Sequence, residues 1–128
     1  DASAHIAHAA ISLLESSNAN PNKITIDKIV CLTETGKTAS NIARFRPQVP
    51  IHALTSNKQT YQKMSLLYTV TPHVVNFPNG EHLGGSPKIL ESLTELGIAK
   101  SGDNILLVHG TFWKKPGLTN TLSILQIP

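Results

Sequence analysis

The residue types that could do chemistry are concentrated in residues 33–38, between two apolar segments. They comprise three hydroxyls, a carboxylate, a glycine and a cation: Thr33, Glu34, Thr35, Gly36, Lys37 and Thr38. Residues 29–32 form an apolar run of strand length before them, and Ala39, Ile42 and Ala43 follow at helical spacing. A strand-to-helix turn leaves backbone N–H groups unpaired at the positive end of the helix dipole, and these donors attract anions. The pattern therefore predicts a phosphate-binding turn, called here the 33–38 turn.

Other interpretations of this turn lead to different chemistry. Gly36-Lys37-Thr38 resembles the end of a Walker A motif, but that motif needs a glycine five positions before Gly36, where this chain has Cys31. Glu34 also disfavours a wrapped triphosphate, because like charges repel at close range. The remaining alternative is an ordinary helix start with Thr35 as its cap. Of these, the anion-binding turn is the hypothesis that we prefer.

A second loop, residues 109–120, carries cations and an aromatic residue after another apolar run. Lys114 and Lys115 could contact an anion, Trp113 could stack or pack, and Gly117 permits close approach. Ligands of open α/β sheets bind outside the carboxyl ends of the strands. We therefore expect both loops to contribute to one site. The alternative for the two lysines is a solvated loop.

The sequence predicts no catalytic residue and no metal site. The acidic residues outside the turn lack paired metal spacing, and no serine lies in a nucleophile elbow. His109 has no obvious partner, and His5 and His8 lack carboxylate or thiol company. Cys31 lies within a predicted strand, where apolar surroundings raise the pKa of a thiol, so we expect it in the core. The small amount of chemistry favours a binding module without a cofactor of its own.

Length and composition predict one globular domain over residues 1–128, with 40% hydrophobic and 15% charged residues. The net charge of +3 is too small to indicate nucleic acid. No apolar run approaches the roughly 20 residues that cross a bilayer. A single cysteine excludes an internal disulfide and fits a reducing compartment. We therefore expect a cytoplasmic protein with neither nucleic acid nor membrane as a partner.

Apolar periodicity predicts helices alternating with strands. We expect helices over residues 2–17, after the 33–38 turn, across the core stripe Tyr61, Met64, Leu67 and Tyr68, and across 89–96. The strands are expected at residues 29–32, 50–54, 73–77, 104–108 and 121–127. This alternation is typical of a three-layer α/β sandwich with a mostly parallel five-stranded sheet. The final connection has no helix, so we expect the last strand to be antiparallel.

Nearly the whole chain resembles the C-terminal domain of pyruvate kinase. That family commonly has a T-x-[S/T]-G-[R/K]-[S/T]-A turn, a helix that ends in Tyr/Phe-Arg-Pro, and a P-I-x-A-x-T strand. The corresponding segments here are TETGKTA at 33–39, FRP at 45–47 and PIHALT at 50–55, followed at the end by GLTNTLSILQIP. The resemblance implies a five-stranded sheet flanked by helices, with the last strand antiparallel.

The resemblance also implies a regulatory role without catalytic residues. Catalysis in this family, with its Mg²⁺ and K⁺ ions, belongs to a separate barrel domain, which is expected in a parent chain. The implied ligand is a phosphorylated effector, either a sugar phosphate such as fructose 1,6-bisphosphate or a nucleoside monophosphate. It would bind at the 33–38 turn, with the 110–118 loop closing over it, in a homo-oligomer to whose interface the domain contributes.

Two departures from the family pattern keep alternatives open. Lys114 and Lys115 stand where the family often has an arginine, so bidentate phosphate recognition is lost. Glu34 occupies a position that is basic in some effector-activated members. A monophosphate effector, or none, therefore stays open. The domain could instead be purely an assembly element with an empty turn, or a free-standing small enzyme or sensor.

Overall fold

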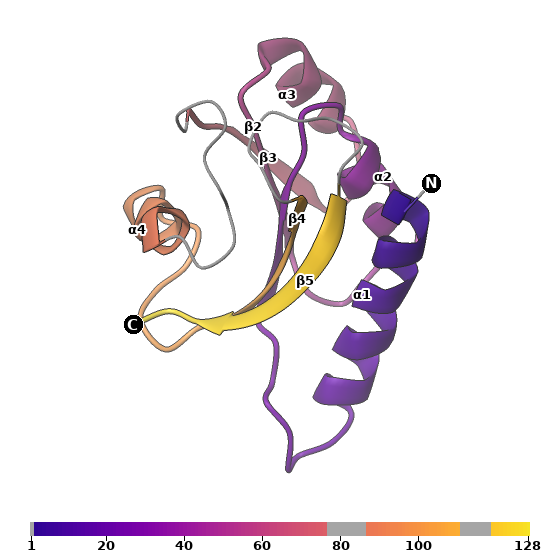
Figure 1. Cartoon of the computed structure of the whole chain (residues 1–128), viewed down its shortest axis with the longest axis vertical. Coiled ribbons are helices and arrows are strands. Elements are labelled where there is room, and N and C mark those ends of the chain that lie inside the picture. The colour runs from indigo at the N-terminus through magenta and orange to yellow at the C-terminus, as the bar shows by residue number, and fades with distance from the viewer. Residues whose placement is uncertain (1, 77–86, 111–118) are drawn as a thin grey trace.

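The fold is built on a five-stranded sheet with the order β3-β2-β1-β4-β5 (Figure 1). The computed structural model describes residues 2–76, 87–110 and 119–128. β1 (Lys28–Leu32), β2 (Ile51–Thr55), β3 (Val70–Val74) and β4 (Asn104–Gly110) run parallel, and β5 (Thr119–Gln126) runs antiparallel to β4. The predicted α/β class, the mixed sheet and the antiparallel last strand are confirmed.

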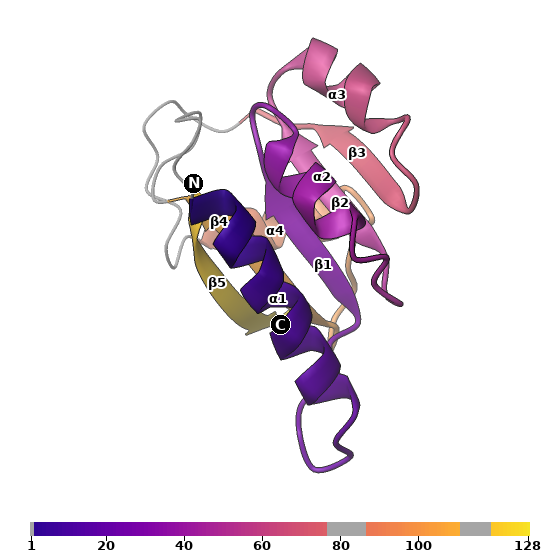
Figure 2. The same ribbon diagram turned by 90° about the vertical axis from the view of Figure 1, so that its right-hand side faces the viewer.

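Helices cover both faces of this sheet (Figures 1 and 2). α1 (Ala2–Asn18), α2 (Lys37–Ala43) and α3 (Lys58–Met64) lie on one face, and α4 (Pro87–Glu95) lies on the other. Alternate residues of β1 enter different cores: Ile29 and Cys31 pack on the α1 side, whereas Val30 and Leu32 pack on the α4 side. Burial on both faces explains why this strand is apolar throughout. Within the described ranges, no helix is both long enough and apolar enough to cross a bilayer.

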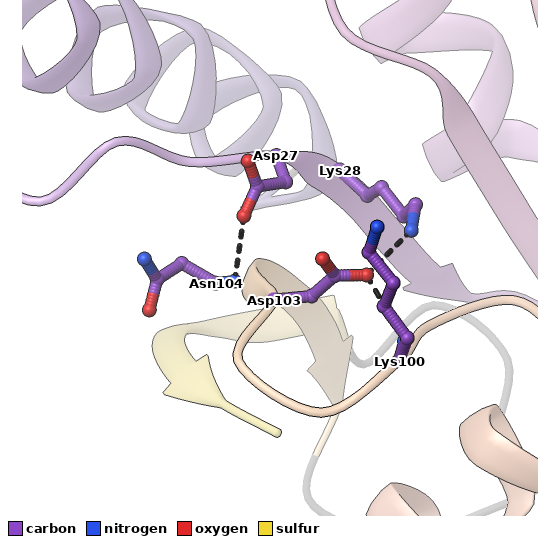
Figure 3. A network of polar contacts seen from close by, with 5 residues as sticks. All are labelled: Asp27, Lys28, Lys100, Asp103 and Asn104. Carbon is purple, nitrogen blue, oxygen red and sulfur yellow. Dashed lines mark hydrogen bonds and ion pairs between the residues drawn. The ribbon is translucent and has the colours of Figure 1, made fainter. Parts of the chain in front are cut away.

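A polar network joins the amino-terminal ends of the two central strands (Figure 3). The Nζ atom of Lys28 lies 2.6 Å from Oδ2 of Asp103, which also accepts a hydrogen bond from the backbone N–H of Lys100 at 3.0 Å. Beside this pair, the backbone N–H of Asn104 donates to Oδ2 of Asp27 at 2.9 Å. These bonds hold β1 against β4 at the edge opposite to the 33–38 turn.

The third strand runs from Val70 to Val74, so the prediction of a strand at 73–77 is wrong in its bounds. Pro72 comes directly before the predicted strand, but it lies in the middle of the observed one. β3 is an edge strand, and the N–H of Val75 donates to the carbonyl of Thr55 on β2 at 2.8 Å. The backbone N–H groups of successive strand residues point alternately toward and away from a neighbouring strand. Since the N–H of Val75 points to β2, that of a residue at position 72 would point away from it. The missing N–H of Pro72 therefore costs no hydrogen bond of the ladder.

The third helix is shorter than predicted, and only part of its apolar stripe is core. α3 ends at Met64, which is fully buried, and Leu67 is partly buried. Tyr61 and Tyr68 are 39% and 77% exposed, so their assignment to the core is wrong. Since the chain leaves the helix after Met64, Tyr68 no longer lies on the face that its spacing predicted.

Candidate functional site

The 33–38 turn lies at a switch point of the sheet. β1 leads through α2 to β2, whereas β4, on the other side of β1, is reached through α4 on the opposite face. Cys31 is paired with Val108, so the carboxyl ends of β1 and β4 lie side by side. Open α/β sheets bind ligands in crevices of this kind, because the connections diverge there.

The threonines of the turn occupy two of its backbone donors. The N–H of Gly36 donates to Oγ1 of Thr33 at 2.9 Å in a buried bond, and the N–H of Lys37 donates to Oγ1 of Thr35 at 3.3 Å in an exposed bond. The expectation that the turn leaves its N–H groups unpaired is therefore wrong for these two. Thr33 and Thr38 are buried, whereas Thr35 and Lys37 are exposed. An incoming anion would thus meet Thr35 and Lys37 first.

The N-cap of α2 is Gly36, not Thr35. Gly36 has a φ of +84°, in the left-handed region that favours glycine. A Cβ atom at this position would lie 3.2 Å from Cγ of Met64. α3 therefore packs directly against the turn. The backbone angle favours a glycine, and a larger residue would also require Met64 to shift.

Glu34 is bonded to the connection between β2 and α3. Its carboxylate accepts hydrogen bonds from the backbone N–H of Ser56 at 2.8 Å and from the Ser56 hydroxyl at 2.6 Å, with Oγ1 of Thr55 more distant at 3.4 Å. The hydroxyl of Thr60 donates to the Glu34 carbonyl at 2.7 Å. The two Ser56 donors solvate the carboxylate, which meets the requirement of a part-buried charge for hydrogen bonds.

A groove of about 450 Å³ opens between α2 and α3, beside the turn. We call it the α2–α3 groove; it is lined by Thr35, Gly36, Lys37, Ser40, Asn41, Arg44, Lys63, Met64 and Leu67. Three of these side chains are cationic, none is acidic, and all three cations are exposed. Hydroxyl, amide and apolar groups complete the lining. The groove thus suits an anion that also carries a polar or apolar body.

Two of the groove cations, Arg44 and Lys63, were not among the predicted site residues. Arg44 follows Lys37 by seven residues, which is about two turns of a helix, so the two share a face. That spacing was a usable signal in the sequence. Lys63 comes from α3, and only the packing of α3 against the turn brings it near.

The second predicted loop cannot be placed in the same way. Its site residues, Trp113, Lys114, Lys115 and Gly117, lie outside the described residues. β4 ends at Gly110, and β5 runs antiparallel to it, so both ends of this loop lie at the carboxyl edge of β4. His109 is buried there, and its Nδ1 is hydrogen-bonded to the Gly110 carbonyl.

Cys31 is in the core, as predicted. The residue is fully buried, and this burial raises the pKa of its thiol to about 12, which leaves no reactive thiolate at neutral pH. Among the described residues, no three histidine, cysteine or acidic side chains cluster closely enough to hold a metal ion.

Comparisons with known proteins agree over most of the chain. The sequence profile of the family described as "Pyruvate kinase, alpha/beta domain" matches residues 5–125. A pyruvate kinase of Eimeria tenella is 33% identical over 123 residues, and one of Thermotoga maritima is 34% identical over 127 residues. These alignments cover 95% and 99% of this chain, but only 22% and 25% of the two relatives. The chain therefore spans about a quarter of their length or less.

A solved structure gives the same result at the level of the fold. The crystal structure of a pyruvate kinase from Cryptosporidium parvum superposes with a TM-score of 0.74 and 25% sequence identity. The match covers all of this chain and 23% of that one.

Proposed function

Because the chain belongs to the pyruvate kinase family, as the alpha/beta domain of that family, we propose that it is a non-catalytic domain that binds a phosphorylated metabolite. The parent chain would hold the catalytic barrel, together with its Mg²⁺ and K⁺ ions, outside these 128 residues. The relatives are four to five times as long as their aligned segments, which leaves room for such a barrel.

The α2–α3 groove is the observation that carries this proposal. It begins at the 33–38 turn, and its lining holds three cationic side chains and no acidic residue. Each charge-assisted hydrogen bond contributes about 1.5–3 kcal/mol, and micromolar binding needs about 8 kcal/mol. One such bond from each of Lys37, Arg44 and Lys63 would give about 4.5–9 kcal/mol, which corresponds to affinities from about millimolar to micromolar.

The chemistry of these cations favours particular ligands. The ammonium group of a lysine acts on a phosphate as a point charge, whereas Arg44 supplies the one planar guanidinium of the groove lining. A sugar phosphate or a nucleoside monophosphate provides one such anion and a polar body of suitable size. Binding would bias the parent enzyme by a typical coupling free energy of about 1–3 kcal/mol.

Isothermal titration calorimetry tests the proposal directly. The chain is titrated with fructose 1,6-bisphosphate, AMP and inorganic phosphate. We expect saturable heat with at least one organic phosphate, and its loss in Lys37→Ala. Lys23→Ala is the matched control, since Lys23 is exposed and contacts Ser16 in another part of the chain. No heat with any ligand at millimolar concentration would refute effector binding.

An assembly role is a second candidate, favoured by the exposed residues that follow α3. Leu66 is 86% exposed and Tyr68 is 77% exposed, and both are large and apolar in character. Exposed apolar side chains close together are typical of contacts between subunits. Sedimentation velocity of Leu66→Ser and Tyr68→Ser tests this role. A homo-oligomer that dissociates in these variants but persists in Lys37→Ala would separate assembly from ligand binding.

A further inference from the structure

Two histidines on neighbouring strands face each other at short range. Nδ1 of His52, on β2, lies 3.0 Å from Nε2 of His73, on β3. Their ring centroids are 5.2 Å apart, and the ring planes differ by 27°. His52 is paired with Val30, whose side chain packs on the α4 side of the sheet. The pair therefore lies on the opposite face from the α2–α3 groove.

A metal ion binds an imidazole through the ring nitrogen that carries no proton. In the contact between His52 and His73 one of the two facing nitrogens donates to the other, so the donor ring would bind the ion as its other tautomer.

The separation of the two nitrogens selects a coordination geometry. Metal–imidazole bonds are about 2.0–2.1 Å long. Two nitrogens 3.0 Å apart that bind the same ion would therefore form an N–metal–N angle of about 94°. This angle is close to the right angle of tetragonal Cu²⁺ and Ni²⁺ complexes and well below the tetrahedral angle that Zn²⁺ prefers. The angle applies to a rotation of each ring that keeps this separation and turns the two hydrogen-bonded nitrogens toward a common ion.

We propose that His52 and His73 form a two-histidine site for a divalent copper or nickel ion, with water in the remaining positions. Lys28 is the cation that acts on His52, and its charge is offset by Asp103, whose Oδ2 lies 2.6 Å from Lys28 Nζ. Since β3 is the edge strand, the bound ion would link that edge to β2.

Nuclear magnetic resonance of the histidine side chains tests the site without altering the chain. Cu²⁺ alone is added below one equivalent, and we expect the imidazole signals of His52 and His73 to broaden before those of the other histidines. Electron paramagnetic resonance should then show nitrogen ligands on a single saturating copper. Broadening that begins at His5, His8 or His109, or that shows no order, would overturn the proposal.

Variants supply the second measurement. His52→Asn and His73→Asn should each abolish the saturating binding step, with folding checked by circular dichroism. The double variant His5→Asn/His8→Asn is the matched control, because these residues lie three apart on α1, and it should bind as the native chain does. Retention of the step in the His52 and His73 variants, or tighter binding of Zn²⁺ than of Cu²⁺ and Ni²⁺, would refute the assignment.

Discussion

The carboxylate of Glu34 accepts hydrogen bonds from both the backbone N–H and the hydroxyl of Ser56, at 2.8 and 2.6 Å. The two residues are 22 positions apart in the sequence, in the loops that follow β1 and β2. One side chain thus ties two neighbouring loops together at the carboxyl edge of the sheet. These two bonds hold the Glu34 carboxylate against the loop that follows β2.

Removal of this link should lower stability. Glu34→Ala leaves two donors of Ser56 without their acceptor, and hydrogen bonds to a charged group contribute about 1.5–3 kcal/mol to folding. We expect the free energy of unfolding in urea to fall by about that amount. Glu15→Ala, at an exposed position of α1, should change it by less than about 0.5 kcal/mol. Equal losses in the two variants would show that the link contributes nothing.

Glycine 36 should be more sensitive to substitution than other glycines with a positive φ. In Gly36→Ala the left-handed backbone costs about 1–2 kcal/mol, and Met64, 3.2 Å from the new Cβ, must also shift. Gly97→Ala and Gly102→Ala carry the same backbone cost, at φ of +73° and +91°, but their Cβ atoms meet nothing within 4 Å. Urea unfolding should therefore rank Gly36→Ala as the most destabilised of the three. A loss no greater than that of Gly97→Ala would mean that Met64 accommodates the methyl group freely.

Most of the fold could be predicted from the sequence, because its central strands carry unambiguous signals. The continuous apolar runs at β1 and β4 indicate burial on both faces, and the missing helix before β5 indicates an antiparallel strand. β3 was misplaced because Pro72 breaks an interior strand but not an edge strand, and the position of a strand in the sheet is not a local property. The prediction that Tyr68 belongs to the core was wrong for a similar reason. Its spacing from Met64 fits a helix, but α3 ends at Met64.

The candidate site could be predicted only in part. The 33–38 turn is contiguous, so its position after β1 followed from the order of the residues. The role of Glu34 could not be inferred, because its partner Ser56 belongs to another loop. Lys63 reaches the groove only through the packing of α3 against Gly36, which depends on the tertiary fold.

The Lys28–Asp103 pair should make stability depend on pH in the acidic range. The hydrogen bond from Lys28, followed by that from the Lys100 backbone, lowers the pKa of Asp103 below its ordinary value of 3.8. The unfolded chain therefore takes up this proton first, so the stabilisation is complete above about pH 4 and is lost as the pH falls through the folded pKa. Urea unfolding of Asp103→Asn and of the native chain should differ most at pH 7 and converge toward pH 2. A difference that is independent of pH would contradict this assignment.

His52 should produce a separate pH dependence at higher pH. Its folded pKa of about 4 lies below the ordinary value of 6.5, so the unfolded chain binds a proton that the folded chain does not. Stability should accordingly be complete above about pH 6.5 and fall as the pH is lowered toward 4. His52→Asn should weaken the pH dependence of the urea unfolding midpoint between pH 7 and pH 5. An unchanged pH dependence in His52→Asn would contradict this assignment.

Lys63 provides the sharpest test of the α2–α3 groove, because α3 carries a matched lysine. Lys63 lines the groove, whereas Lys58, at the start of the same helix, is exposed and does not line it. Both substitutions to alanine remove one positive charge from one helix. Loss of a charge-assisted hydrogen bond of about 1.5–3 kcal/mol corresponds to roughly a 10–150-fold weaker affinity.

Calorimetry with the tightest organic phosphate should therefore give a dissociation constant raised by roughly 10–150-fold in Lys63→Ala. Lys58→Ala should shift it by no more than the small effect of net charge, which added salt suppresses. Thermal unfolding of the two variants should be similar, because both side chains are exposed. If both variants raise the dissociation constant equally, and added salt removes this difference from the native chain, the lysines of α3 act only through long-range electrostatic attraction. The ligand would then lie outside the groove, at the 33–38 turn alone.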